Sequence, residues 1–171
     1  MTDRATIFRR LGTALLPLLL AGCATSWEPA PAEPPVVETR VRQPAQQDSA
    51  GAQVYPLRNP AVMELLGTAD AAEDRGDYEQ AAALLERALR IQPRNPEVLQ
   101  QMAEVQLHVQ DYQQALNFAV RSYDVGPRVG EICSRNWRTI SVAREYLGDR
   151  GGAVEAERRA GACMSTKPPS L

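Results

Sequence analysis

The residues best suited to chemistry in this chain are its three cysteines, Cys23, Cys133 and Cys163, and its single histidine, His108. Cys23 lies in the stretch LLAGCATS and could be a core residue, half of a disulfide or the first residue of a mature chain. His108 has no sequence neighbour that would complete a metal site, and the chain contains no HExxH, CxxC, phosphate-binding loop or nucleophile elbow. The sequence therefore predicts neither an enzyme nor a metal site, and the first question is what Cys23 does.

The residues before Cys23 have the organisation of an export signal. Residues 1–10 carry three arginines and one aspartate, and residues 11–21 carry no charge. This apolar segment is too short to span a bilayer, which takes about 20 residues. A basic start, a short apolar run and small residues before a cleavage site are typical of a secretory signal peptide. The tetrapeptide LAGC that ends at Cys23 also resembles the lipobox of bacterial lipoproteins.

The lipobox resemblance implies that residues 1–22 are removed and that Cys23 is lipidated. In that family the sulfur receives a diacylglyceryl group and the new amine receives an acyl chain. Stable anchoring needs two or more lipid chains, so this modification would hold the protein at a membrane permanently. By the same resemblance, Ala24 at the second mature position implies the periplasmic face of the outer membrane. No other cofactor is expected.

Residues 23–60 are predicted to be a lipidated cysteine followed by a disordered linker. Seven prolines fall between residues 27 and 60, with neither helical nor strand periodicity, and such a segment cannot bury enough apolar surface to offset its ordering entropy. The simplest interpretation is a passive spacer. The formal net charge of −2 gives no electrostatic case for nucleic acid, which normally calls for a strongly basic face.

From residue 61 onward the sequence repeats itself. The segment 76–81, GDYEQA, recurs as QDYQQA at 110–115, and the same shift of 34 residues maps Leu65 to Leu99 and Pro93 to Pro127. A third copy, GDRGGA at 148–153, follows after an offset of 38 residues. An ordinary helical bundle would not require a fixed period. The pattern resembles the tetratricopeptide repeat (TPR).

This resemblance implies an all-α fold, a three-repeat helical solenoid over residues 61–164. Small residues recur on the first helix of each pair (Ala69, Ala103, Ser141) and on the second (Ala81, Ala115, Ala153), where they would let the helices cross closely. The repeats are expected at about 62–95, 96–129 and 134–165, with a disordered tail at 165–171. The expected helices are 61–75, 78–92, 95–109, 112–124, 131–147 and 151–163.

Cys133 and Cys163 remain as a pair once Cys23 carries lipid. They open and close the third helical hairpin, so they should meet, and an oxidising compartment would favour a disulfide between them. On the chain-entropy estimate such a bond stabilises by roughly 3–4 kcal/mol. We expect it to replace an additional capping helix, which is not evident after residue 163; two unrelated buried thiols are the alternative.

In the TPR family the first helices of successive repeats line a concave groove that binds a peptide. Residues 61–127 hold 11 acidic and 5 basic side chains, while 128–167 holds 5 acidic and 8 basic, so the groove should be acidic at one end and basic near Arg135 and Arg138. Any single charge could equally be part of a solvated face. The register places these residues in the groove: Met63, Leu66, Asp70, Glu73, Glu97, Gln100, Glu104, His108, Arg135, Arg138, Thr139, Val142 and Tyr146. The expected partner contacts are Gln100, Glu104, His108, Arg135, Arg138, Thr139 and Tyr146.

The combination of lipobox, proline-rich linker and short C-terminal TPR domain resembles the lipoprotein activators of class A penicillin-binding proteins. That resemblance implies a protein partner, a peptidoglycan synthase, and a membrane contact through the lipid anchor, with no nucleic acid and no small-molecule substrate. A pilotin or assembly factor for a secretin or another outer-membrane machine is an alternative, although such proteins usually have more repeats and little linker. A cell-wall enzyme is disfavoured because the catalytic motifs are missing.

Overall fold

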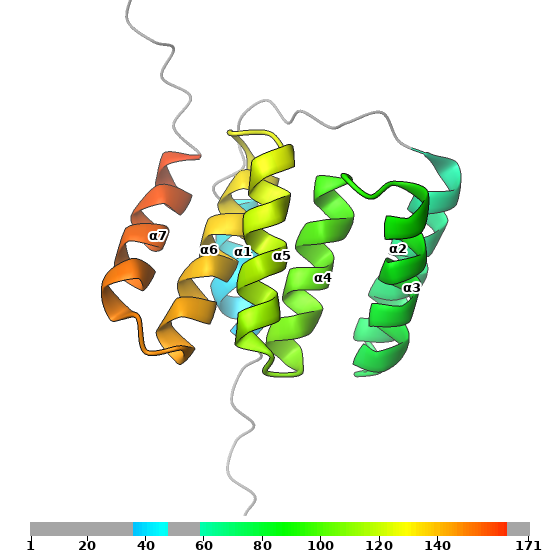
Figure 1. The fold of residues 1–171 in the computed structure, drawn as a ribbon, viewed down its shortest axis with the longest axis horizontal. Helices are drawn as coiled ribbons and strands as arrows, with labels where there is room; N and C mark the ends of the chain where they lie inside the picture. Colours follow the sequence, from blue (N-terminus) through cyan, green and yellow to red (C-terminus); the bar gives the residue numbers. More distant parts are fainter. Residues whose placement is uncertain (1–35, 48–58, 164–171) are drawn as a thin grey trace, which may run out of the picture. The chain divides into compact units, whose positions relative to one another are not determined.

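The computed structural model describes residues 36–47 and 59–163, and the described part is built of helices, with no strand among these residues (Figure 1). Six α-helices form three consecutive antiparallel pairs, and a shorter helical segment precedes them. The fold is therefore the all-α solenoid expected from the repeat. The bounds are η1 (Val37–Arg42), α1 (Gln43–Gln47), α2 (Pro60–Glu73), α3 (Tyr78–Ile91), α4 (Pro96–His108), α5 (Tyr112–Val125), α6 (Glu131–Tyr146) and α7 (Arg150–Ala162).

The second helix of each pair begins at an aspartate in the same way. Asp77, Asp111 and Asp149 accept hydrogen bonds from the backbone N–H three residues later, at 3.0, 3.0 and 2.8 Å. Each aspartate satisfies one of the donors left unpaired at a helix start and places a negative charge at the positive end of the helix. These caps follow from the repeated Asp, which the sequence places at equivalent positions.

The first helices of the first two pairs begin with Asn-Pro. Asn59 and Asn95 accept hydrogen bonds from the following backbone N–H groups, and Pro60 and Pro96 occupy the first helical position, where a missing N–H costs nothing. The third pair departs from this pattern because α6 follows Gly130, whose φ of 82° lies in the left-handed region that favours glycine. This junction is where the extra residues of the third repeat fall.

Small side chains lie where the two helices of each pair cross. Ala69, Ala81, Ala103 and Ala115 are fully buried, and Ser141 donates a 2.9 Å hydrogen bond to the carbonyl of Ala153. Because these side chains are short, the helix axes can approach closely enough for larger neighbours to interlock on either side. The small residues picked out by the repeat therefore have the positions expected of them.

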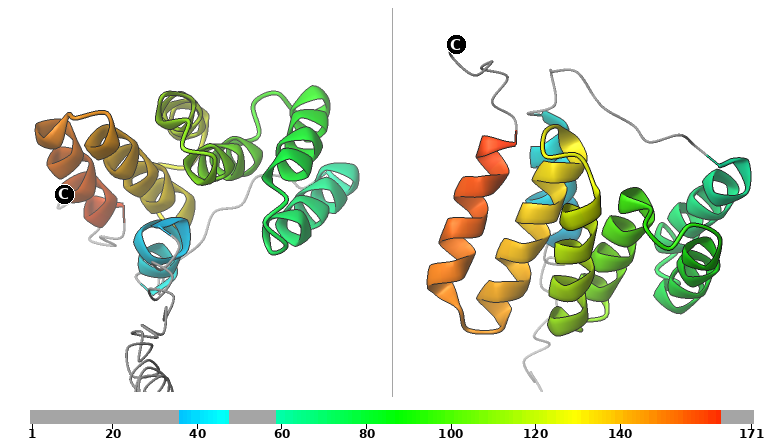
Figure 2. Two further views of the ribbon diagram at one scale, coloured as in Figure 1. Left: turned by 90° about the horizontal axis from the view of Figure 1, so that it is seen from below. Right: turned by 45° about the horizontal axis from the view of Figure 1, so that its top comes forward.

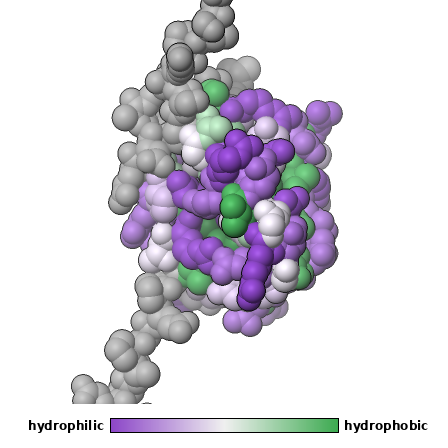
Figure 3. Space-filling model, turned by 90° about the vertical axis from the view of Figure 1, so that its left-hand side faces the viewer, coloured by the Kyte–Doolittle hydropathy of each residue, from purple (hydrophilic) through white to green (hydrophobic). Residues whose placement is uncertain are grey.

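The C-terminal pair carries a disulfide between Cys133 and Cys163, with a Cα–Cα distance of 5.7 Å. The carbonyl of Cys163 also accepts a 3.0 Å hydrogen bond from the backbone N–H of Gly130. The end of α7 is thus tied to the start of α6. Figure 3 looks onto the α7 end of the molecule, where hydrophilic side chains predominate, as suits the last helix of a stack.

The expectation that residues 23–60 lack helical structure is wrong for residues 36–47. Val37, Val41 and Ala45 recur at intervals of four residues and are buried, so one face of η1 and α1 is apolar. Pro44 has no N–H to donate to the carbonyl four residues earlier, and the turns before it have the wider π-helical pattern, with Gln43 donating to Glu38. The apolar spacing in this segment outweighs the proline content. The signal peptide, Cys23 and the tail at 165–171 lie outside the described residues.

Candidate ligand-binding groove

The η1–α1 segment lies against the first helices of the repeats. Figure 2 shows it end-on beside α6, and its residues also approach α4. Val37 and Val41 pack in one apolar cluster with Leu107 and Val142. The cluster is completed by Ala115 and Ala143, with Tyr112 and Leu116 at its margin. We call the surface formed by α2, α4 and α6 on this side the concave groove.

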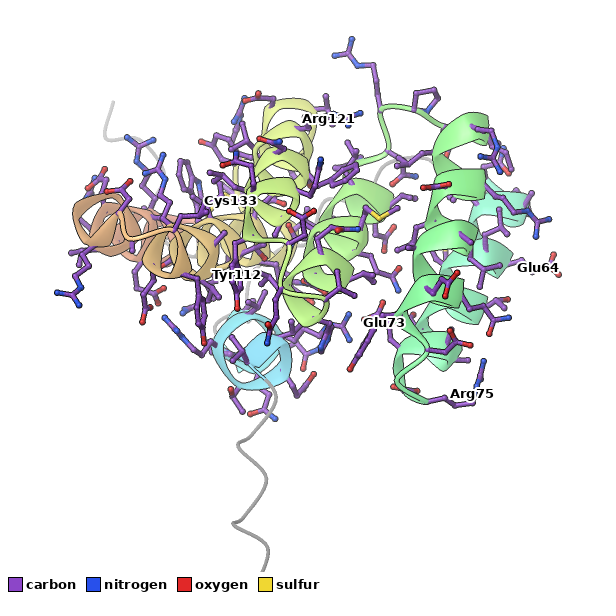
Figure 4. The ribbon with its side chains drawn as sticks, turned by 60° about the horizontal axis from the view of Figure 1, so that its bottom comes forward. Glu64, Glu73, Arg75, Tyr112, Arg121 and Cys133 are labelled. Atoms are coloured by element: carbon purple, nitrogen blue, oxygen red, sulfur yellow. A yellow bond between two sulfur atoms is a disulfide. The ribbon has the colours of Figure 1, made fainter. Side chains whose placement is uncertain are left out.

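Arg42 is the polar centre of this contact. Its Nη2 donates to Glu73 Oε2 on α2 at 2.6 Å, and its Nε donates to Glu104 Oε2 on α4 at 2.8 Å. Figure 4 shows Glu73 pointing from α2 toward the η1–α1 helix. Burial opposes a charge on Arg42, but the two carboxylates raise the pKa of its guanidinium further above the ordinary value. One arginine therefore joins the first and second repeats from outside the repeats.

Glu104 is fully buried and shared between two arginines. Arg135 on α6 donates to both of its oxygens, and Gln100 donates to Oε1 at 2.9 Å and to Thr139 Oγ1 at 2.8 Å. Burial alone would raise the pKa of Glu104, but the charges of Arg135 and Arg42 and the hydrogen bonds from Arg135 and Gln100 lower it to about 2. Glu104 is thus a carboxylate at neutral pH.

Two further carboxyl groups extend this cluster along α2. Gln101 donates to Asp70 Oδ1 at 2.6 Å and to Glu73 Oε1 at 2.8 Å. Burial raises the pKa of Glu73, and the charge of Arg42 and the hydrogen bond from Gln101 oppose this rise. Burial also raises the pKa of Asp70, against the charges of Arg42 and Arg135. We call Asp70, Glu73 and Glu104 the carboxylate cluster; it is built to hold a guanidinium.

Comparison with known proteins identifies the architecture. A family model for the tetratricopeptide repeat matches residues 72–121. The solved globular C-terminal domain of P. aeruginosa LpoP is similar over 61% of this chain and 98% of that domain, with 38% sequence identity and a TM-score of 0.57. The chain belongs to the tetratricopeptide-repeat family. No curated protein sequence matches it.

The TPR fold makes the described domain a protein-interaction module, and its chemistry agrees with that role. Within residues 36–47 and 59–163 no group of three or more His, Cys, Asp or Glu side chains is arranged to hold a metal ion. The helices in the same ranges also include none with the length and apolar character needed to cross a membrane. What the groove offers instead is a row of carboxylates beside an apolar surface.

Four residues predicted for the TPR groove meet in one network. Gln100, Glu104, Arg135 and Thr139 are joined by the hydrogen bonds described above and are largely buried. The network links α4 to α6 and so couples the second repeat to the third. Arg135 therefore faces Glu104 rather than forming an open basic end of the groove.

The other three predicted contact residues lie outside this network. Arg138 is paired with Glu157 on α7. The ring of His108 stacks on Tyr78, with centroids 4.4 Å apart, and burial together with the charge of Arg42 lowers the pKa of the imidazole. Tyr146 is 51% exposed and stacks on Tyr112 at 4.5 Å. These positions form the margins of the TPR groove.

Arg42 is the groove residue that the repeat pattern could not supply, because it precedes the first repeat. The available signal was local: two valines four residues apart, Val37 and Val41, followed directly by an arginine. The surrounding prolines hid that signal in the composition of the linker.

Proposed function

We propose that this protein is a lipoprotein of the outer membrane whose periplasmic TPR domain binds and activates a class A penicillin-binding protein. The observation that carries the proposal is the 38% identity to the C-terminal domain of P. aeruginosa LpoP over 98% of that domain. It joins the lipobox before Cys23 and the proline-rich segment, which together resemble lipoprotein activators of these synthases. The lipid would be a diacylglyceryl group and an N-acyl chain on Cys23.

In this arrangement the lipid sets where the TPR domain operates. Acyl chains on Cys23 would remain in the outer membrane, since two or more chains together anchor a protein stably. Residues 24–58 would cross from the membrane toward the peptidoglycan layer, and the domain would meet a synthase held in the inner membrane. The protein would alter the synthase by binding it and would perform no chemistry of its own.

Lipidation is tested by replacing Cys23 with alanine in cells. The natural chain should fractionate with the outer membrane, and mass spectrometry of its N-terminal peptide should show an acylated Cys23. The Cys23→Ala variant should appear in the soluble periplasmic fraction. An unmodified natural chain that still carries Met1 would contradict the lipoprotein assignment.

The partner is tested in intact cells and with purified components. Chemical crosslinking followed by mass spectrometry should enrich a class A synthase with the natural chain. The unlipidated mature chain, carrying Cys23→Ser, should increase glycan polymerisation by that synthase in detergent. Absence of both effects, with the domain folded by circular dichroism, would refute the activator role. Enrichment of secretin components instead would favour an assembly factor.

A further inference from the structure

We propose that the concave groove is a receptor for one helix bearing two aliphatic side chains and an arginine, and that η1–α1 fills it in cis until a partner helix of the same chemistry replaces it. The proposal deepens the proposed function and rests on it for the partner being a protein. It defines the ligand by three features of the segment itself: an aliphatic residue, a second four positions later and an arginine directly after the second.

The contact surface has the chemistry of a ligand site. Val37 and Val41 bury their side chains against α4 and α6, and Arg42 reaches two carboxylates on two different repeats. Groove-binding helices in general use apolar anchors one turn apart for affinity and a charge for orientation. The segment shows this division on opposite sides of a single turn of helix.

The carboxylate cluster requires a cation in this position. The arginines bonded to Glu73 and Glu104 are Arg42 and Arg135, and both carboxyl groups are almost completely shielded from solvent, with side-chain exposures of 3% and 0%. Removing Arg42 would leave two buried carboxylates beside one guanidinium. An uncompensated buried charge is strongly destabilising, so the groove favours replacement of Arg42 by another guanidinium over vacancy.

The segment is held near the groove by a short connection. It ends at Gln47 and the repeats start at Asn59, so its effective concentration at the groove is on the order of millimolar. A free helix of equal intrinsic affinity cannot compete at micromolar concentration. A partner must therefore make additional contacts, and the pocket of about 450 Å³ beside the segment, lined by Arg138, Val154 and Glu157 among others, offers a place for them.

Replacement would change how far the TPR domain reaches from the membrane. With η1–α1 in the groove, the chain from Cys23 to Val36 spans at most about 45 Å; with the segment released, the chain from Cys23 to Asn59 spans up to about 120 Å. Occupation of the groove by a partner would thus lengthen the tether at the moment of binding. The segment is then a latch as well as a ligand.

The test uses a fluorescent synthetic peptide of residues 34–47, PPVVETRVRQPAQQ, added to the unlipidated mature chain. Val41→Asp with Arg42→Glu in the chain should expel the segment and leave the groove open. The peptide should then bind this variant at least about tenfold more tightly than the natural chain, because the cis competitor is gone. A control peptide carrying the same two substitutions should not bind either chain.

Two measurements guard against a misfolded variant. Circular dichroism and the disulfide between Cys133 and Cys163 should be unchanged, and the milder variant Arg42→Ala should give an intermediate affinity. Amide hydrogen exchange should show residues 36–47 protected in the natural chain and unprotected in the double variant. Equal peptide affinity for the two folded chains, or no binding to the folded variant, would overturn the proposal.

The same assay separates this proposal from the proposed function. A purified class A synthase that binds the natural chain should displace the peptide from the double variant. If the synthase binds without displacing the peptide, groove exchange is refuted and the activator role stands. If the peptide binds as expected and the synthase neither binds nor is activated, the groove chemistry stands and the activator role fails.

Discussion

Arg135 on α6 grips the carboxylate of Glu104 on α4 with two parallel hydrogen bonds, of 2.8 Å from Nε and 2.7 Å from Nη2. The pair joins neighbouring repeats through charge where the rest of their contact is apolar. A planar guanidinium matches both oxygens of a carboxylate, so lysine at position 135 could not reproduce this geometry. The link therefore fixes the relative placement of α4 and α6.

The depressed pKa of Glu104 predicts an acid-sensitive fold. Its carboxyl titrates at about 2 in the folded protein and near 4.5 when unfolded, so the unfolded state binds the proton more readily. The stability from this group, about 3 kcal/mol, is complete above pH 4.5 and is lost as the pH falls toward 2. Urea unfolding between pH 2 and pH 7 should show this decline.

The control for this prediction is Glu104→Gln, which should be destabilised at pH 7 and lose less stability on acidification than the natural chain. Glu73→Gln should retain the acid-dependent loss. The raised pKa of Glu73 acts in the opposite direction, since its contribution is present at low pH and lost as the pH rises through that pKa. A side-chain carboxyl signal of Glu104 that titrates near 4.5 by NMR would contradict the assignment.

The disulfide predicts a redox-dependent stability. Cys133 and Cys163 close a loop with a sequence separation of 30 residues, and on the chain-entropy estimate the bond stabilises the fold by roughly 3–4 kcal/mol. Reduction, or Cys133→Ala with Cys163→Ala, should lower the free energy of unfolding by about that amount in urea. Alkylation in denaturant without reductant should label neither cysteine; labelling of both would show that the bond is absent.

The repeats could be predicted from the sequence because each helix boundary has a local chemical cause. Asp77 and Asp111 start helices, and the prolines at 93 and 127 follow their ends, so the observed bounds of α3 and α5 differ from the expected ones by a single residue. The period of 34 residues then placed the remaining elements by repetition. Local causes repeated at a fixed interval are what a sequence displays most clearly.

The occupant of the groove could not be predicted in the same way. Three prolines, at positions 34, 35 and 44, dominate the composition around Val37 and Val41, and a helix this short is marginal in water without tertiary contacts. Its stability comes from the groove, which is assembled by residues far along the chain. Likewise, the charge of Arg135 was visible in the sequence, but its partner Glu104 lies 31 residues earlier.

The aspartate caps predict a modest, position-specific loss. Asp111 accepts a 3.0 Å hydrogen bond from the backbone N–H of Gln114 at the start of α5. Asp111→Ala should lower the free energy of unfolding by about 1 kcal/mol. The matched control is Asp124→Ala, an exposed aspartate in the same helix, which should change stability by no more than about 0.5 kcal/mol. Equal effects of the two substitutions would show that the cap does not stabilise α5.

Two glycines predict opposite effects of the same substitution. A methyl group at Gly67, inside α2, would meet no atom of the described residues within 4 Å, so Gly67→Ala should stabilise the helix by up to about 1 kcal/mol. A methyl group at Gly126 would lie 2.8 Å from the carbonyl oxygen of Ser122 and 2.9 Å from Cβ of Pro96. Both contacts involve rigid atoms, so α5 and the start of α4 would have to separate, and Gly126→Ala should destabilise by about 1–3 kcal/mol. Urea midpoints at a constant m-value measure both changes, and a stabilising Gly126→Ala would mean that the loop between α5 and α6 does not hold Pro96 this closely.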